Sequence, residues 1–121
     1  MDKSLSGRRI LVVEDEMLNL AMLEDILTEA GCEVAAAATI DQAVAVIGER
    51  VFDAALLDIK LKGNAAYAVA DALAVRGVPF IFVTGNSARD IEGSYRDRPL
   101  LRKPFKEEKL VEALTDLLPP R

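Results

Sequence analysis

Several apolar runs in this sequence end abruptly in residues that could bind a cation or a phosphoryl group. Each of these residues carries a carboxylate, a hydroxyl or an ammonium group, and they are Glu14, Asp15, Asp58, Thr84 and Lys103. Carboxylates gathered without a cation repel one another, and their pKa values rise. A hard divalent cation such as Mg²⁺, which prefers oxygen ligands and often uses one or two carboxylates, removes that repulsion. The residue types therefore predict a magnesium site beside groups suited to a phosphoryl oxygen.

A carboxylate at such a site can act as a nucleophile toward phosphorus. Its attack gives an acyl phosphate, which is a recognised kind of covalent intermediate. Phosphoryl transfer mainly requires positioning and charge neutralisation, and a lysine, a threonine hydroxyl and a cation supply both. The sequence contains no histidine. Catalysis by Ser-His-Asp or Cys-His groups, histidine-ligated metals and a phosphohistidine on this chain are therefore excluded.

Length and composition indicate one small acidic domain. The chain has 121 residues, of which 51% are hydrophobic, so it can bury a core of its own. Its formal charge of −5 disfavours broad nucleic-acid binding. One cysteine excludes an intramolecular disulfide and a cysteine-based zinc site. No apolar run approaches the ~20 residues that cross a bilayer, and no secretory signal is visible, so we expect a cytoplasmic protein without membrane or nucleic-acid partners.

Strands and helices are expected to alternate along the chain. The expected strands cover residues 9–13, 33–38, 52–57, 79–83 and 100–101, and the expected helices cover residues 17–30, 39–47, 65–75, 87–95 and 106–118. This order predicts an α/β fold with a doubly wound, parallel five-stranded sheet. In such sheets ligands bind beyond the carboxyl ends of the strands, which is where the reactive residues fall. We expect residues 1–7 to be a flexible tail, residues 8–118 the domain and residues 119–121 a second tail.

Four segments in this order on the βα pattern, LVVEDE, LLDIK, FVTGN and LRKPF, resemble the receiver domain of response regulators in two-component signalling. The resemblance covers residues 8–118 and implies a flavodoxin-like (βα)5 fold with strand order 2-1-3-4-5. Carried over by position, it implies these roles: Asp58 as phosphoacceptor, Asp15 as direct ligand of Mg²⁺ (or Mn²⁺), Glu14 as the acid that acts on metal-bound water, the Lys60 carbonyl as a further metal ligand, Thr84 as the switch hydroxyl and Lys103 as the partner of the phosphoryl group.

Two further segments, PFIFVTG and VADAL, are similar to the FATGUY subgroup of receivers. That subgroup implies a stand-alone regulator served by a histidine kinase of the HWE or a related class, or by a phosphotransfer protein. The regulator would act by contact with a downstream protein or as a phosphate sink. It would catalyse its own phosphorylation and dephosphorylation without turning over an external substrate. Leu100 stands where the family usually has a switch aromatic.

Three alternatives remain open from the residues. Taken alone, the pair Glu14 and Asp15 favours the start of a helix, where acids are stabilised, and only together with the other three sites does it favour a metal site. The chain is also compatible with a receiver-like binding module that is never phosphorylated and, more distantly, with a magnesium-dependent phosphohydrolase. Two local hypotheses accompany the main interpretation: the Lys60 ammonium obstructs the water that attacks the acyl phosphate, and residues 86–98 are mobile until phosphorylation orders them.

Overall fold

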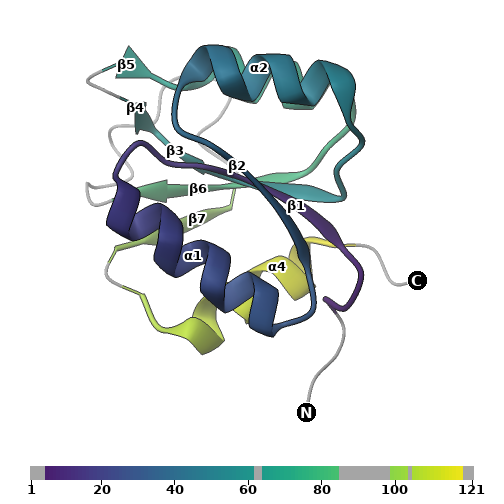
Figure 1. Ribbon diagram of the computed structural model, residues 1–121, viewed down its shortest axis with the longest axis vertical. Helices are drawn as coiled ribbons and strands as arrows, with labels where there is room; N and C mark the ends of the chain where they lie inside the picture. The colour runs from purple at the N-terminus through teal and green to yellow at the C-terminus, as the bar shows by residue number, and fades with distance from the viewer. Residues whose placement is uncertain (1–4, 62–63, 85–98, 104, 119–121) are drawn as a thin grey trace.

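The computed structural model describes residues 5–61, 64–84, 99–103 and 105–118, and these contain one parallel five-stranded sheet (Figure 1). Its strands are β1 (Arg9–Val13), β2 (Glu33–Ala37), β3 (Ala54–Asp58), β6 (Phe80–Thr84) and β7 (Leu100–Arg102). They are hydrogen-bonded in the order β2-β1-β3-β6-β7, with every pair parallel. The predicted order 2-1-3-4-5 is therefore confirmed, as is the flavodoxin-like α/β class.

Helices cover both faces of the sheet (Figure 1). The helices of the described residues are α1 (Met17–Glu29), α2 (Ile40–Glu49), α3 (Tyr67–Val75) and α4 (Glu107–Leu117). Buried side chains of α1 and α4 pack on one face, and those of α2 and α3 pack on the other. This layering is the doubly wound arrangement that alternating strands and helices predict. The helix expected over residues 87–95, and the hypothesis about residues 86–98, lie outside the described residues.

The central strands are buried on both faces because their side chains alternate between two cores. In β1, Leu11 and Val13 join the core under α2 and α3, whereas Ile10 and Val12 join the core under α1 and α4. All four side chains are at most 1% exposed. A strand covered on both sides must be apolar at every position, which explains the continuous apolar runs in the sequence.

Two local features were predicted and found at the ends of helices. Thr39 is the N-terminal cap of α2, and its hydroxyl accepts a hydrogen bond of 3.1 Å from the Gln42 backbone N–H. Gly31 follows α1 with a φ of +93°, a conformation that glycine adopts without the strain of a side chain. Both residues end or begin a helix where the sequence pattern indicates it.

The structure differs from the sequence prediction over residues 59–64. These were expected to form a loop, but β4 (Lys60–Leu61) and β5 (Asn64–Ala65) pair as a short antiparallel hairpin. The buried side chain of Ile59 is 2% exposed, and its carbonyl accepts a 2.7 Å hydrogen bond from the Ala66 N–H. This anchor holds the two ends of the segment together, which local residue types do not reveal.

The ordered domain begins earlier than residue 8. Leu5, expected in a flexible tail, is 2% exposed in the core under α1 and α4. The Gly7 N–H donates a 2.8 Å hydrogen bond to the Gly31 carbonyl. Apolar burial and this backbone contact fix residues 5–7 against the end of α1. None of the helices in the described ranges is both long and apolar enough to cross a membrane.

Candidate functional site

Three acidic side chains meet at the carboxyl edge of the sheet. Glu14 and Asp15 directly follow β1, and Asp58 is the last residue of β3. The two strands are neighbours, with Val13 paired to Leu57, so their ends lie side by side. One carboxylate oxygen of each acid lies within 4.8 Å of those of the other two. The parallel sheet thus gathers residues that are more than forty positions apart in sequence.

Lys103 reaches this acidic cluster from the end of β7, the last strand in the order of the sheet. It follows β7, which pairs with β6, and its backbone N–H donates a 2.8 Å hydrogen bond to the Thr84 carbonyl. Its ammonium Nζ donates to Glu14 Oε1 at 2.7 Å and to Asp58 Oδ2 at 3.2 Å. The lysine therefore links the ends of β1, β3 and β7 in one polar centre.

Burial and charge act against each other on these groups. Burial alone would raise the pKa of Glu14, whose side chain is 2% exposed, but hydrogen bonds with Asp58 and Lys103 outweigh it, and the pKa lies below the ordinary value. Burial would lower the pKa of Lys103, but its contacts with Glu14 and Asp58 raise that pKa above the ordinary value. Both shifts favour the charged forms, so the ion pair persists at neutral pH.

The donor set fits a hard divalent cation. Among the described side chains, three carboxylates and one ammonium group form the cluster, so these four groups carry an excess of two negative charges when all are ionised. Only oxygen atoms are offered as ligands by these acids, which suits Mg²⁺ rather than a soft metal. A cation at this edge would offset the repulsion between the carboxylates.

Thr84 and Lys60 lie at the ends of neighbouring elements. Thr84 is the last residue of β6, is 3% exposed and pairs with Arg102 in the ladder that precedes Lys103. Asp58 pairs with Val83, the residue before Thr84. Lys60 begins β4, two residues after Asp58, and the structure describes its backbone. All six residues singled out from the sequence therefore belong to segments at the carboxyl edge of the sheet.

An apolar surface beside the acidic cluster was missed by the sequence analysis. A hollow of about 420 Å³ is lined by Lys103, Phe105 and α1 residues that include Met22. On the same helix, Met17, Leu18 and Met22 are 70%, 80% and 48% exposed. The signal was present in the sequence, because these apolar residues fall outside the helical repeat of Leu20, Leu23 and Leu27 that is buried. We call Met17, Leu18, Met22 and Phe105 the α1 surface.

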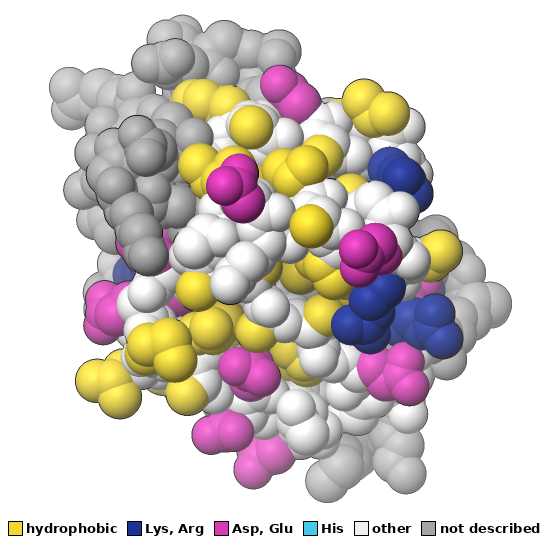
Figure 2. Space-filling view, turned by 45° about the horizontal axis from the view of Figure 1, so that its top comes forward, with side chains coloured by type: hydrophobic (Ala, Val, Ile, Leu, Met, Phe, Trp, Pro, Cys, Tyr) yellow, Lys and Arg dark blue, Asp and Glu magenta, His cyan; other side chains and the backbone are white. Residues whose placement is uncertain are grey.

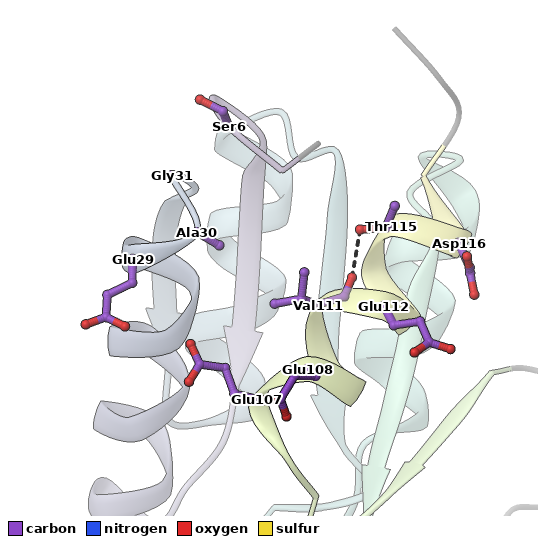
Figure 3. Close-up of a pocket in the computed structure, with 10 residues that line it drawn as sticks. All are labelled: Ser6, Glu29, Ala30, Gly31, Glu107, Glu108, Val111, Glu112, Thr115 and Asp116. Atoms are coloured by element: carbon purple, nitrogen blue, oxygen red, sulfur yellow. Dashed lines mark hydrogen bonds between the residues drawn. The ribbon is translucent and has the colours of Figure 1, made fainter. Parts of the chain in front are cut away.

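A larger hollow lies apart from the cluster. It measures about 990 Å³ and lies between α1 and α4, where Glu29, Glu107 and Glu112 are among its lining residues (Figure 3). Neither the three clustered acids nor Lys103 contributes to its lining. The centre with convergent charged groups, rather than this hollow, is therefore the candidate site.

Comparison with known proteins identifies the class that this fold and site define. The family model of the response regulator receiver domain matches residues 10–115. The match covers most of the chain, and the chain belongs to this family. The acidic cluster and Lys103 therefore lie within a response regulator receiver domain.

Particular relatives differ in how much of their length the chain covers. The transcriptional regulatory protein TcrA of Mycobacterium tuberculosis is 35% identical over 120 residues, and the match covers 93% of this chain and 47% of TcrA. The chain therefore spans about half the length of the curated relatives it matches. The solution structure of SdrG from Sphingomonas melonis Fr1 is 39% identical, with a TM-score of 0.79, and the match covers 97% of this chain and 98% of that one.

A third relative was solved with a cation and a beryllium fluoride group. The response regulator TrrA of Thermotoga maritima, in complex with Mg²⁺-BeF, is 28% identical. Its TM-score is 0.81, and the match covers 92% of this chain and 99% of that one.

Proposed function

We propose that this protein accepts a phosphoryl group on Asp58 in a magnesium-dependent reaction and later hydrolyses the product itself. The observation that carries the proposal is the pair of hydrogen bonds from Lys103 Nζ to Glu14 and Asp58, with Asp15 in the same cluster. The three acids can supply a nucleophile and ligands for a cation, and the lysine can neutralise charge on a phosphoryl group. These are the functions that phosphoryl transfer to a carboxylate requires.

Asp58 is the nucleophile in this proposal. One of its carboxylate oxygens forms a bond to phosphorus while the bond from phosphorus to the imidazole nitrogen of the donor breaks, and that electron pair stays on the imidazole. Bound Mg²⁺ would neutralise charge on the phosphoryl oxygens. Asp15, Asp58 and the Lys60 carbonyl would hold the cation, and Glu14 would act through a coordinated water.

Lys103 and Thr84 position the transferred group. The Lys103 ammonium already lies 3.2 Å from an Asp58 oxygen, so it can donate to a phosphoryl oxygen attached there. The Thr84 hydroxyl, at the end of the next strand, is the second donor. Attack of water on the phosphorus of the acyl phosphate then releases inorganic phosphate and regenerates the Asp58 carboxylate.

The phosphoryl donor is proposed to be a histidine kinase, of the HWE or a related class, or a phosphotransfer protein. Because these 121 residues include no histidine, the phosphohistidine must lie outside this sequence. Exposed apolar side chains on a water-soluble domain mark an interaction site, and the α1 surface adjoins Lys103. A partner docked there would lie beside the reacting carboxylate.

The finer assignment is a cytoplasmic, single-domain regulator of the FATGUY subgroup that signals by protein contact or drains phosphate from a kinase. The nearly complete mutual coverage with the solved SdrG chain supports the single-domain part of this proposal. The motifs PFIFVTG and VADAL support the subgroup. Measuring phosphotransfer from purified kinases of the HWE and other classes tests the partner directly.

Phosphorylation by a small acyl phosphate such as acetyl phosphate tests the central proposal. Intact-mass spectrometry should show one added phosphoryl group in the presence of Mg²⁺, none in EDTA and none in Asp58→Asn. Asp25→Asn, an exposed acid on α1, is the charge-matched control and should be phosphorylated normally. Absence of uptake in the native chain would instead support a phosphorylation-independent binding module, and turnover of general phosphate esters would support a phosphohydrolase.

A further inference from the structure

A third hollow lies at the edge of the sheet opposite the acidic cluster. It measures about 400 Å³, and its lining includes Arg8, Asp53 and Pro79, which directly precede β1, β3 and β6. The amino ends of the strands therefore face this hollow, whereas Asp58 and Thr84 stand at their carboxyl ends. The two sites are separated by the length of the sheet.

Three arginines from three different segments line this hollow. Arg8 precedes β1, Arg50 is the C-terminal cap of α2 and Arg76 is the C-terminal cap of α3. We call the hollow lined by Arg8, Arg50 and Arg76 the arginine pocket. Figure 2 shows Lys and Arg side chains gathered on one side of the molecule, the side on which α2 ends in Figure 1. This grouping is notable in a chain whose net charge is −5.

Contacts within the protein hold the guanidinium groups in place. The Arg50 guanidinium carbon lies 5.6 Å from the centre of the Phe52 ring, within the range of a cation–π contact. Arg76 Nη2 donates a 3.4 Å hydrogen bond to the Gly48 carbonyl at the end of α2. Arg8 is 8% exposed, and its Nη1 lies 3.9 Å from Asp53 Oδ1. The positive charges are therefore positioned before any ligand arrives.

The charges of the lining residues do not balance. Asp53 is the single acid among the residues that line the hollow in the described part of the chain, against three arginines, which leaves two positive charges in excess. Asp53 is also engaged by the backbone, since its Oδ2 accepts a 2.8 Å hydrogen bond from the Arg9 N–H. The walls between the charges are apolar and include Ile47, Phe52 and Val78.

We propose that the arginine pocket binds a compact polyanion that carries two neighbouring phosphate or carboxylate groups. Guanidinium groups present planar pairs of donors that match phosphate and carboxylate oxygens. A hollow of about 400 Å³ is within the range of small-molecule sites. The ligand would bind without competing with phosphorylation of Asp58, because the two sites lie at opposite edges of the sheet.

The test is an NMR titration of ¹⁵N-labelled protein in magnesium-free buffer with EDTA, with pyrophosphate and citrate as separate probes and sodium chloride at matched ionic strength as reference. Saturable shifts are expected at the arginine Nε–H groups and at the Gly77 and Val78 amides. Stronger binding of pyrophosphate would assign a phosphate ester, and stronger binding of citrate would assign a polycarboxylate. Shifts that do not saturate, or that sodium chloride reproduces, would overturn the proposal.

Charge variants separate a site from general attraction of anions. Arg50 and Arg76 are exposed, so the double variant Arg50→Gln/Arg76→Gln should fold, and it should bind the preferred probe at least about tenfold more weakly. Arg102→Gln, an exposed arginine on β7, is the single-charge control and should bind normally. Asp53→Asn, which keeps an acceptor for the Arg9 N–H, should bind more tightly. Equal affinity in the double variant and the native chain would contradict the assignment.

Discussion

Replacing Asp58 by asparagine is expected to stabilise the metal-free protein while it abolishes phosphorylation. The substitution keeps the size of the side chain and removes one of the three carboxylates that share the carboxyl edge of the sheet. A residue positioned for chemistry rather than for stability should show both effects on substitution, a gain in stability and a loss of activity. The sign and size of the effect follow from the charges that surround Asp58.

The magnitude is set by one attraction and two repulsions. At an effective dielectric constant of about 20, the 3.2 Å contact between Lys103 Nζ and Asp58 Oδ2 is worth roughly 5 kcal/mol. When all three carboxylates are ionised, the oxygens of Glu14 and Asp15 within 4.8 Å together contribute at least roughly 7 kcal/mol of repulsion. Loss of the Asp58 charge should therefore increase the free energy of unfolding by about 1–2 kcal/mol after solvent screening.

Urea denaturation followed by far-UV circular dichroism measures this difference. In EDTA the Asp58→Asn midpoint should lie above the native midpoint with an unchanged slope. With Mg²⁺ the order should reverse, because a cation bound at one hundred times its dissociation constant adds about 2.7 kcal/mol to the native protein and less to a variant that lacks a ligand. Asp25→Asn makes the same change in net charge on an exposed part of α1 and should stay within about 0.5 kcal/mol of native.

A lower stability of Asp58→Asn in EDTA would refute the reasoning. It would mean that the Lys103 contact outweighs the repulsion, and that the acidic cluster is a stabilising ion-pair network rather than a cation site. An equal response of the native chain and the variant to Mg²⁺ would likewise place the cation elsewhere.

Three further substitutions test the α1 surface and two helix ends. Leu18→Glu should slow transfer from a phosphohistidine protein several-fold and leave uptake from acetyl phosphate unchanged. The control Val75→Glu, at a residue of α3 that is 87% exposed, should alter neither rate. If Leu18→Glu lost phosphorylation with both donors, the result would argue against docking at the α1 surface. Thr39→Ala removes the hydroxyl that accepts the Gln42 N–H at the start of α2, and it should reduce the free energy of unfolding by about 1 kcal/mol. An unchanged midpoint of urea denaturation would contradict a stabilising role for this cap. Gly31→Ala, at a φ of +93°, should cost about 1–2 kcal/mol in the same assay, and a neutral result would show that the backbone relaxes there.

Strand and helix positions were predictable because the relevant signals are local. Runs such as residues 80–83 are buried on both faces and are therefore apolar throughout. Thr39 and Gly31 mark helix ends through the hydrogen-bonding and conformational preferences of single residues. The β4–β5 hairpin was missed, because two-residue strands depend on the anchoring of Ile59 in the core and leave no periodic pattern.

Surface features were less predictable than the core. The packing of Leu5 requires the end of α1 and the neighbouring core, both of which are distant in sequence. The arginine pocket unites residues 8, 50 and 76, and no spacing in the sequence connects them. Such groupings arise from the crossover connections of the sheet, which bring three segment ends to one edge.

The sequence by itself determined the elements, their alternation and the residue types that stand at the ends of the strands. Those types already restrict the chemistry to carboxylates, a hydroxyl and an ammonium group, because histidine is absent and cysteine is single. Tertiary structure alone decided that Lys103 bonds to Glu14 and Asp58, which lie 89 and 45 positions away in the chain. Parallel pairing places the carboxyl ends of β1, β3, β6 and β7 along one edge, and only there can one ammonium group reach two carboxylates at once.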